Sequence, residues 1–401
     1  MAKPYQPSTR RIPELDGMRV MLVFMVSWYH IWQLSWLTPR VGSYSLDFLV
    51  RTGYVPVDGM ILLSGFLLFL PYARTMLEGD PMPSTRRFYQ RRVMRIVPSH
   101  YATVLLMLFC IALPYGLYSS TSQMAQDVAS HLTFTHTFFR GSYFNTKVGG
   151  TAWTLAIEMQ AYLIFPLIAR MAVRNTAGTT GYMMLAAWIF RAVCMWKMTD
   201  YGFVVNQLPN FLDVYAIGML SALAYVKLTQ VWKKAKKPLL WEALATALIV
   251  LCLWLLVKEL KLQASSPNSA ATQTGQMLRR PLFASLLAVT MVSLPFSVLP
   301  LRFLMGNRVM HWLSLISFNY YLVHQNVAVH LKRLGIPPSV SDEPHRVGER
   351  AWQYPYVFLC FGVSVAVAIL LTLLVEKPGS WALGKLFARL DRRKKAVKTA
   401  A

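Results

Sequence analysis

Long apolar blocks alternate with short polar or Pro/Gly-rich stretches along the whole chain. Most blocks hold about 18 to 22 residues, enough for a helix to cross a ~30 Å hydrocarbon core at ~1.5 Å per residue. The blocks predict membrane-spanning helices at residues 17–37, 53–73, 98–118, 152–170, 181–198, 209–226, 239–257, 281–300, 311–331 and 354–375. The predicted fold class is all-α, a polytopic membrane protein of about ten transmembrane helices.

Composition supports a lipid-embedded chain, because 55% of the 401 residues are hydrophobic and only 14% are charged. A soluble domain usually carries roughly a quarter charged residues. The formal net charge of +24 would also suit a nucleic-acid binder. The basic residues stand between apolar blocks, however, which favours contact with anionic membrane lipids and predicts no nucleic-acid partner. Four cysteines without paired spacing indicate neither a disulfide framework nor a metal site.

Lysines and arginines are unevenly distributed between the two sides of the predicted membrane. With the N-terminus inside, the cytoplasmic segments hold 27 of the 41 basic residues, including Lys3 and Arg10. Cytoplasmic loops carry such an excess, so both termini are predicted to be cytoplasmic and the long loop 119–151 external.

No repeat or appended domain is evident. We expect one transmembrane domain over 1–401, a basic cytoplasmic tail at 377–401, and a multi-pass location in the cell membrane, the inner one in a Gram-negative source.

Two ionisable residues occur in the first predicted span, Arg19 near its inner end and His30 further out. Eleven residues separate them, which brings them within about 20° of alignment on a helix with ~16 Å of axial rise. An ionisable side chain inside a membrane span is costly and indicates a functional site. His30 is therefore the leading candidate for a catalytic residue.

Other ionisable residues are predicted at a similar depth. Glu158, His324, Asp58 and Asp213 each lie a few residues inside the outer boundary of their span. Together with His30 they would form one layer, in which a carboxylate orients a neutral histidine that removes a proton from a hydroxyl. Each has a structural alternative: His324 could be a hydrogen-bonded packing residue, Asp213 could cap a helix, and Asp58 could either order helix ends or line a site.

A cluster of arginines precedes the third predicted span. In the segment RRVMR, Arg92 and Arg95 are three residues apart and share a helix face. Guanidinium groups at the mouth of a helix bind phosphate oxygens well. The alternative is that these arginines only fix the membrane orientation.

Six motifs in order resemble those of the membrane acyltransferase 3 family, whose members O-acylate cell-surface glycans, lipids and some metabolites. They are LDGMR with WYH (15–19 and 28–30), SGFLL (64–68), RRVMRIVPSHY (91–101), WTLAIEMQAYLIFP (153–166), SFNYYLVH (317–324) and VEKP (375–378). Two departures are Met60 and Ile61 before SGFLL, where the family usually has an aromatic pair, and His100, which replaces a commonly aromatic residue.

The resemblance implies an O-acyltransferase that uses cytoplasmic acyl-CoA, often acetyl-CoA, as co-substrate and holds no permanent cofactor. In such proteins Arg19, Arg92 and Arg95 would hold nucleotide or pyrophosphate oxygens, and His30 would act on the acceptor hydroxyl with Glu158 as its partner. The acceptor would be a glycan, a glycolipid or a metabolite. The expected substrate pocket takes its residues from several predicted spans: Asp58, Trp153, Tyr162, Tyr321 and His324.

The main alternative is a proton-coupled transporter that uses buried histidines and carboxylates. A transporter would be expected to show internal symmetry and helices broken at matching positions, and the sequence shows neither. A third possibility is a non-catalytic scaffold, against which the intact Arg19, His30, Arg92, Arg95 and Glu158 argue.

Overall fold

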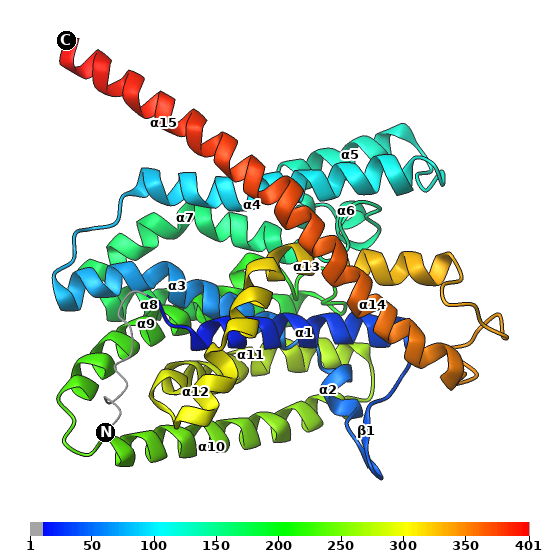
Figure 1. Ribbon diagram of the computed structural model, residues 1–401, viewed down its shortest axis with the longest axis horizontal. Helices are drawn as coiled ribbons and strands as arrows, with labels where there is room; N and C mark the ends of the chain where they lie inside the picture. Colours follow the sequence, from blue (N-terminus) through cyan, green and yellow to red (C-terminus); the bar gives the residue numbers. More distant parts are fainter. Residues whose placement is uncertain (1–10, 401) are drawn as a thin grey trace. The chain divides into compact units, whose positions relative to one another are not determined.

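The computed structural model describes residues 11–400, with side chains as far as Asp391, and is 78% helical (Figure 1). Within the described part, strands are limited to a small antiparallel hairpin of β1 (Arg40–Val41) and β2 (Tyr44–Ser45). The all-α prediction is therefore confirmed.

Each predicted span overlaps one long helix. These helices are α1 (Glu14–Ser35), α3 (Pro56–Glu78), α4 (Thr85–Met107), α7 (Trp153–Arg174), α8 (Thr176–Lys197), α9 (Leu212–Lys233), α10 (Pro238–Ala264), α11 (Ser269–Ser293), α13 (Arg308–Arg333) and α14 (Arg350–Leu371). The remaining helices are α2 (Asp47–Arg51), α5 (Thr121–Leu132), α6 (Arg140–Phe144), α12 (Leu299–Gly306) and α15 (Lys377–Ala400). Short 3-10 or π segments are η1 (Leu108–Ala112), η2 (His136–Phe138), η3 (Leu208–Phe211), η4 (Leu294–Phe296) and η5 (Thr372–Glu376).

Seven helical segments of the described chain are long and apolar enough to cross a membrane. They include α3, α9, α10 and α11, as well as α4 with η1. This confirms a multi-pass membrane protein, whereas the count of ten spans and the cytoplasmic termini stay predictions. Lys3 and Arg10, which contributed to the predicted orientation, lie outside the described residues.

The chain divides into two compact units. Unit 1 comprises residues 1–82, 167–317 and 335–357, as far as they are described, and unit 2 comprises 83–166, 318–334 and 358–401. Three of the five boundaries between the units fall inside α7, α13 and α14.

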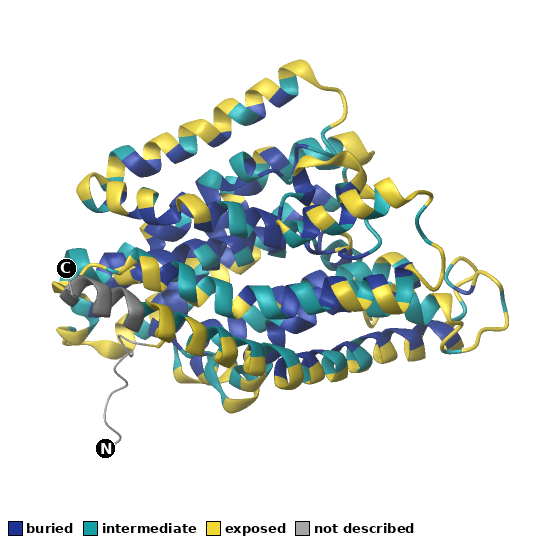
Figure 2. Cartoon of the chain, turned by 90° about the horizontal axis from the view of Figure 1, so that it is seen from above, coloured by how far each residue is buried: buried dark blue, intermediate teal, exposed yellow. Residues whose placement is uncertain are grey.

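In unit 1, α3 and α9 pack closely because glycines line their contact. A Cβ at Gly65, in the SGFLL motif, would lie 2.9 Å from the carbonyl oxygen of Tyr215, and one at Gly218 would lie 2.5 Å from that of Leu62. Small residues allow such close approach between membrane helices. The buried positions of α3, α9 and α11 make up much of the unit's interior, while α10 is exposed along much of its length (Figure 2).

In unit 2, α4 begins thirteen residues before the predicted span at 98. Ser84 caps this helix by accepting a hydrogen bond from the Arg87 backbone N–H, and arginine itself is a good helix former. The arginine cluster therefore belongs to the same helix as the membrane segment. The predicted basic tail is also helical, as α15, and it packs along α4 where Ser380 Oγ donates to the Met94 carbonyl at 2.6 Å.

The predicted external loop 119–151 contains α5, η2 and α6. The apolar-block pattern missed these elements because they are too short and too polar to cross a membrane. Ser120 caps α5 by accepting a hydrogen bond from the Gln123 N–H. This segment is an ordered part of unit 2.

Candidate functional site

In unit 1, α1 carries Arg19 and His30 on one uninterrupted helix. Their separation of eleven residues gives about 16 Å of rise with nearly the same orientation around the helix axis. Both side chains are half-buried. His30 Nδ1 lies 3.1 Å from Oε1 of Gln33, one turn further along α1, and its ring lies 5.0 Å from the Tyr29 ring. The expected placement of a cation and an imidazole at two levels of α1 is thus present.

The first motif also contains an anchor for α1. Asp16 accepts hydrogen bonds from Arg11 at 2.6 Å and from the Ser314 hydroxyl at 3.0 Å, and its carboxylate lies 3.0 Å from His311 Nδ1. Ser314 and His311 belong to the first part of α13, which is in unit 1. Gly17, next to Asp16, lies so close to the Met305 backbone that a Cβ at this position would clash with the Met305 carbonyl oxygen. Asp16 and Gly17 therefore fix the position of the helix that carries His30.

Asp58 and Asp213 each form a buried ion pair with an arginine. Asp58 Oδ1 lies 2.9 Å from Nε of Arg280, and Asp213 accepts from two nitrogens of Arg191 at 2.6 and 2.9 Å. All four side chains are at most 3% exposed. Asp213 is thus more than a helix cap. The sequence analysis selected neither arginine, although Arg191 lies inside the predicted span 181–198 and Arg280 directly precedes the span 281–300.

In unit 2, three predicted site residues form a continuous chain. The Arg92 guanidinium lies over the Tyr162 ring at 5.3 Å, and the Tyr162 hydroxyl donates a hydrogen bond to Glu158 Oε2 at 3.0 Å. Glu158 and Tyr162 are one turn apart on α7, so they share a helix face. Phe88 supports the arrangement because its ring lies 5.6 Å from Arg92 and stacks on Phe165 at 6.0 Å.

Arg95 belongs to a second group, which includes two residues that sequence reasoning did not select. The charge of Arg95 acts on Glu376, whose Oε2 accepts a hydrogen bond from Asn319 Nδ2 at 2.6 Å. Asn319 also donates to the Thr372 hydroxyl at 2.8 Å. The motifs RRVMR, SFNYYLVH and VEKP thus meet within unit 2. Both residues stand in the motifs, but Asn319 is not ionisable and Glu376 lies one residue beyond the predicted span 354–375, so neither was selected as an ionisable residue inside a span.

Tyr321 and His324 are both buried on the second part of α13. The Thr154 hydroxyl donates to the Tyr321 hydroxyl at 3.0 Å, and Tyr321 lies near enough to Glu158 to interact with its charge. His324 Nδ1 lies 2.8 Å from the Tyr321 carbonyl oxygen, which matches the packing alternative for this histidine. Trp153 begins α7 and is half-buried.

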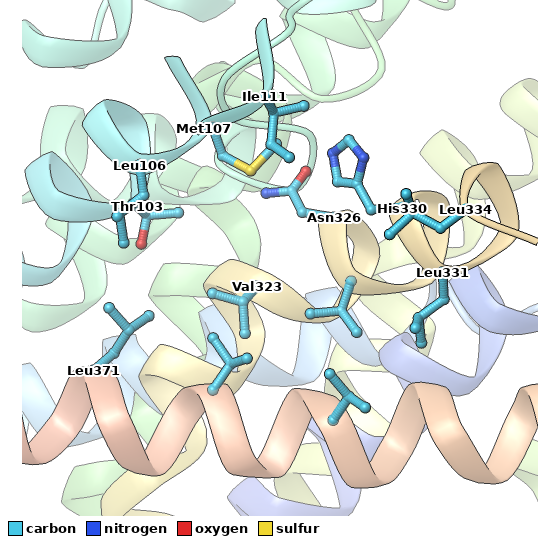
Figure 3. A pocket seen from close by; sticks show the side chains of 13 residues that line it. Thr103, Leu106, Met107, Ile111, Val323, Asn326, His330, Leu331, Leu334 and Leu371 are labelled. Atoms are coloured by element: carbon cyan, nitrogen blue, oxygen red, sulfur yellow. The ribbon is translucent and has the colours of Figure 1, made fainter. Parts of the chain in front are cut away.

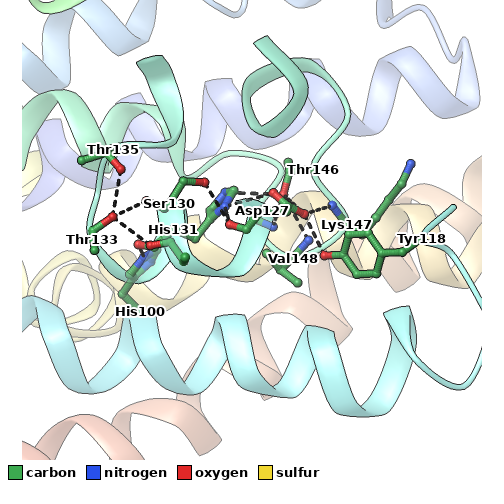
Figure 4. A network of polar contacts seen from close by, with 12 residues as sticks. His100, Tyr118, Asp127, Ser130, His131, Thr133, Thr135, Thr146, Lys147 and Val148 are labelled. Carbon is green, nitrogen blue, oxygen red and sulfur yellow. Dashed lines mark hydrogen bonds and ion pairs between the residues drawn. The ribbon is translucent and has the colours of Figure 1, made fainter. Parts of the chain in front are cut away.

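A second polar network of unit 2 surrounds Asp127 on α5 (Figure 4). Asp127 Oδ2 accepts hydrogen bonds from the Tyr118 hydroxyl at 2.8 Å, the Thr146 hydroxyl at 3.2 Å and the Lys147 backbone N–H at 2.9 Å. Burial alone would raise the pKa of Asp127, but hydrogen bonds from His131 and from the Lys147 backbone hold that pKa below its usual value. The network orders the segment that was predicted to be a loop.

His100, the departure from the family pattern, contacts this segment. Its Nε2 lies 2.9 Å from the His131 carbonyl oxygen, and its ring stacks on Phe134 with centroids 4.7 Å apart. An imidazole at this position therefore combines aromatic stacking with a hydrogen bond to backbone. His100 is a structural residue of unit 2.

The candidate residues thus fall into two sets. Unit 1 contains Arg19, His30 and Asp58, and unit 2 contains Arg92, Arg95, Trp153, Glu158, Tyr162, Tyr321 and His324. Within unit 2 the structure connects Arg92 to Glu158 through Tyr162 and places Tyr321 near Glu158. In such a site the Arg92 guanidinium can bind an anionic group, and the neighbouring aromatic rings can contact an apolar part of the same molecule.

A polytopic helical protein with these motifs belongs to the class of membrane acyltransferases. Residues 12–373 match a protein-family model with the description "Acyltransferase domain". The chain therefore belongs to this acyltransferase family. The matched region contains the other five motifs, whereas VEKP (375–378) lies just beyond its end.

Individual relatives match over shorter stretches. O-acetyltransferase OatA of Staphylococcus aureus is 29% identical over 182 residues, which is 42% of this chain and 26% of OatA. ORF330 of Acidianus two-tailed virus is 24% identical over 234 residues, which is 58% of this chain and 62% of that protein. The chain therefore spans only about a quarter of the length of OatA. No solved structure matches.

Proposed function

We propose that this chain is an integral membrane O-acyltransferase that moves an acyl group, acetyl in the simplest case, from cytoplasmic acyl-CoA to a hydroxyl of a cell-surface glycan, glycolipid or metabolite. Membership of the acyltransferase family supports the reaction class. The name of the similar OatA supports an oxygen acceptor and an acetyl group. The apolar helices support a reaction at the membrane, here proposed to be the cell membrane.

One observation in unit 2 supports the proposed donor site. Arg92 is held against Tyr162, and Tyr162 is bonded to Glu158, so a cation, an aromatic face and a carboxylate follow one another along α4 and α7. Arg92 and Arg95, with Arg19, are proposed to bind the phosphate oxygens of acyl-CoA. Trp153 and Tyr162, together with Tyr321, Asp58 and His324, are proposed to shape the pocket for the acyl group or the acceptor.

His30 is the proposed general base. Its neutral imidazole accepts the proton of the acceptor hydroxyl while the oxygen attacks the thioester carbonyl and forms a tetrahedral intermediate. The C–S bond then breaks, and the coenzyme A thiolate takes the proton back from the imidazolium, leaving an ester and a free thiol. Glu158 is proposed to orient His30 or to stabilise its charge. Formation of an acyl-histidine before transfer is equally compatible with these residues.

The test is thiol release from acetyl-CoA by the purified full-length protein in detergent, with a panel of soluble glycans as acceptors. The proposal predicts acceptor-dependent thiol release and an acetylated glycan detected by mass spectrometry. A protein that moves protons or solutes across proteoliposomes but never cleaves the thioester would support the transporter instead.

A further inference from the structure

An apolar groove of about 240 Å³ lies within unit 2, and it does not include any of the proposed site residues. Figure 3 shows side chains from α4 with η1, from α13 and from α14 directed into one common space. Its walls are mainly aliphatic, with Met107 and Ile111 on one side, Val323 and Leu334 on the second, and Val363 and Val367 on the third.

The size of the groove fits a hydrocarbon chain. An apolar cavity of about 150 Å³ is known to take up a molecule such as benzene, so this groove has room for a longer segment. Along α14 the lining extends from Val363 to Leu371, which corresponds to about 12 Å of helix. That is more than a third of a ~30 Å hydrocarbon core.

The surroundings of the groove face hydrocarbon. Both α4 with η1 and α14 belong to the segments that are apolar enough to cross a membrane. Next to the lining, Leu105 and Phe109 are 41% and 61% exposed. Lipid is therefore the medium in contact with this face, rather than a water-soluble partner.

One end of the groove carries positive charge. The last turn of α13 contains His330, which lines the groove, and Arg333, which immediately precedes the lining residue Leu334. The Arg333 guanidinium lies 3.9 Å from the centre of the Tyr115 ring, so it is held across the gap between α13 and the segment after η1. Among the described residues, Arg333 forms no ion pair with a carboxylate. An anionic group at this end of the groove would provide the negatively charged partner of the Arg333 guanidinium.

We infer that this groove is a binding site for one hydrocarbon chain of an anionic phospholipid, with the lipid phosphate at Arg333. The hydrocarbon chain lies between α13 and α14, and the headgroup contacts the last turn of α13. The inference is independent of the acyl transfer proposed above, because it concerns a different set of residues.

The test uses photolabelling of the full-length protein in nanodiscs of phosphatidylcholine. A trace of phosphatidylglycerol or of phosphatidylcholine with a diazirine in one acyl chain is added, and labelled peptides are mapped by mass spectrometry. We expect label on the peptides that contain residues 323–334 and 363–371, at a level roughly fivefold higher for the phosphatidylglycerol probe, as one arginine contact to an anionic lipid would give.

Two substitutions and a matched control separate the parts of the site. Val367→Trp fills the groove and should reduce labelling of these peptides at least fivefold, whereas Leu370→Trp, on the same helix at a residue that is 55% exposed, should leave it unchanged. Arg333→Gln should abolish the preference for phosphatidylglycerol.

A competition experiment on the unsubstituted protein makes the test independent of folding of the variants. Excess unlabelled phosphatidylglycerol should displace the label from both peptides, and excess phosphatidylcholine should do so much less. Uniform labelling of all lipid-exposed helices, or equal competition by the two lipids, would show ordinary annular lipid and would overturn the inference.

Discussion

The hydroxyl of Tyr162 donates a hydrogen bond to Glu158 at 3.0 Å while its ring lies under the Arg92 guanidinium. One side chain thus connects the paired-arginine segment of α4 to the carboxylate of α7. The two contacts use different parts of the tyrosine, so substitutions can remove them separately.

Tyr162→Phe keeps the ring under Arg92 and removes only the hydrogen bond to Glu158. We expect kcat to fall roughly five- to tenfold, because a hydrogen bond to a charged group contributes about 1.5–3 kcal/mol, of which part is used in the transition state. The KM for acetyl-CoA should change little. Tyr162→Leu removes the cation–π contact with Arg92 as well. The KM of this variant for acetyl-CoA should therefore rise a few-fold. Equal kinetics for both variants would contradict separate roles.

Arg92→Gln and Arg95→Gln should raise the KM for acetyl-CoA roughly tenfold each, because each removes a charge-assisted contact with phosphate. Arg87→Gln is the matched control, since Arg87 is exposed on the same helix and lies about 140° around it from Arg92. S-acetylpantetheine, which lacks the nucleotide and pyrophosphate, provides a second control. The KM for S-acetylpantetheine should be unaffected by the arginine substitutions. An equal rise in KM for both donors would argue against phosphate binding.

Arg280→Met leaves the buried carboxylate of Asp58 without its 2.9 Å partner. We expect a loss of about 3–5 kcal/mol in stability, because an uncompensated buried charge is strongly destabilising. The double variant Asp58→Leu with Arg280→Met should recover much of that loss in thermal unfolding. If the recovered protein also transfers acyl groups normally, Asp58 has a structural role alone; recovery of folding without activity would support its place in the substrate pocket.

Asp127→Asn tests the polar network around α5. Burial opposes the ionised form, but the hydrogen bonds from His131 and from Lys147 outweigh it and keep the pKa of Asp127 below 3.8 in the folded protein. The ionised carboxylate therefore contributes stability that is fully present well above pH 3.8 and is lost as the pH falls through the lower folded pKa. The substitution should lower the unfolding temperature at pH 7. Below about pH 4 the difference in unfolding temperature from the unsubstituted protein should become progressively smaller. A difference that is constant with pH would exclude this electrostatic origin.

Much of the fold was predictable because it depends on local hydrophobicity. Each of the ten predicted spans overlaps a long helix, since an apolar block of that length has few alternatives in a membrane. The early start of α4 was not predicted, because a stretch of arginines has no apolar periodicity and its helical state depends on packing against α15 and on Phe88.

The candidate site was predictable in its residue types more than in its contacts. The sequence pointed to Arg92, Glu158 and Tyr162 but not to the tyrosine as the link between them, because α4 and α7 are far apart in sequence. The group of Arg95, Glu376 and Asn319 was missed for the same reason, because Arg95 lies more than two hundred residues from Glu376, which in turn accepts a hydrogen bond from Asn319. Arg191 and Arg280 were not selected, although Arg191 lies inside a predicted span, because their pairing with Asp213 and Asp58 depends on contacts between helices that the sequence pattern does not show.

The most direct test of the central claim measures acyl transfer from acetyl-CoA by purified full-length protein with and without His30→Gln, together with the Kd for acetyl-CoA. His30 carries the proposed proton transfer, so the account predicts a loss of about 10²- to 10⁴-fold in turnover with an unchanged Kd and unfolding temperature. Turnover by the variant at the rate of the unsubstituted protein would contradict the account.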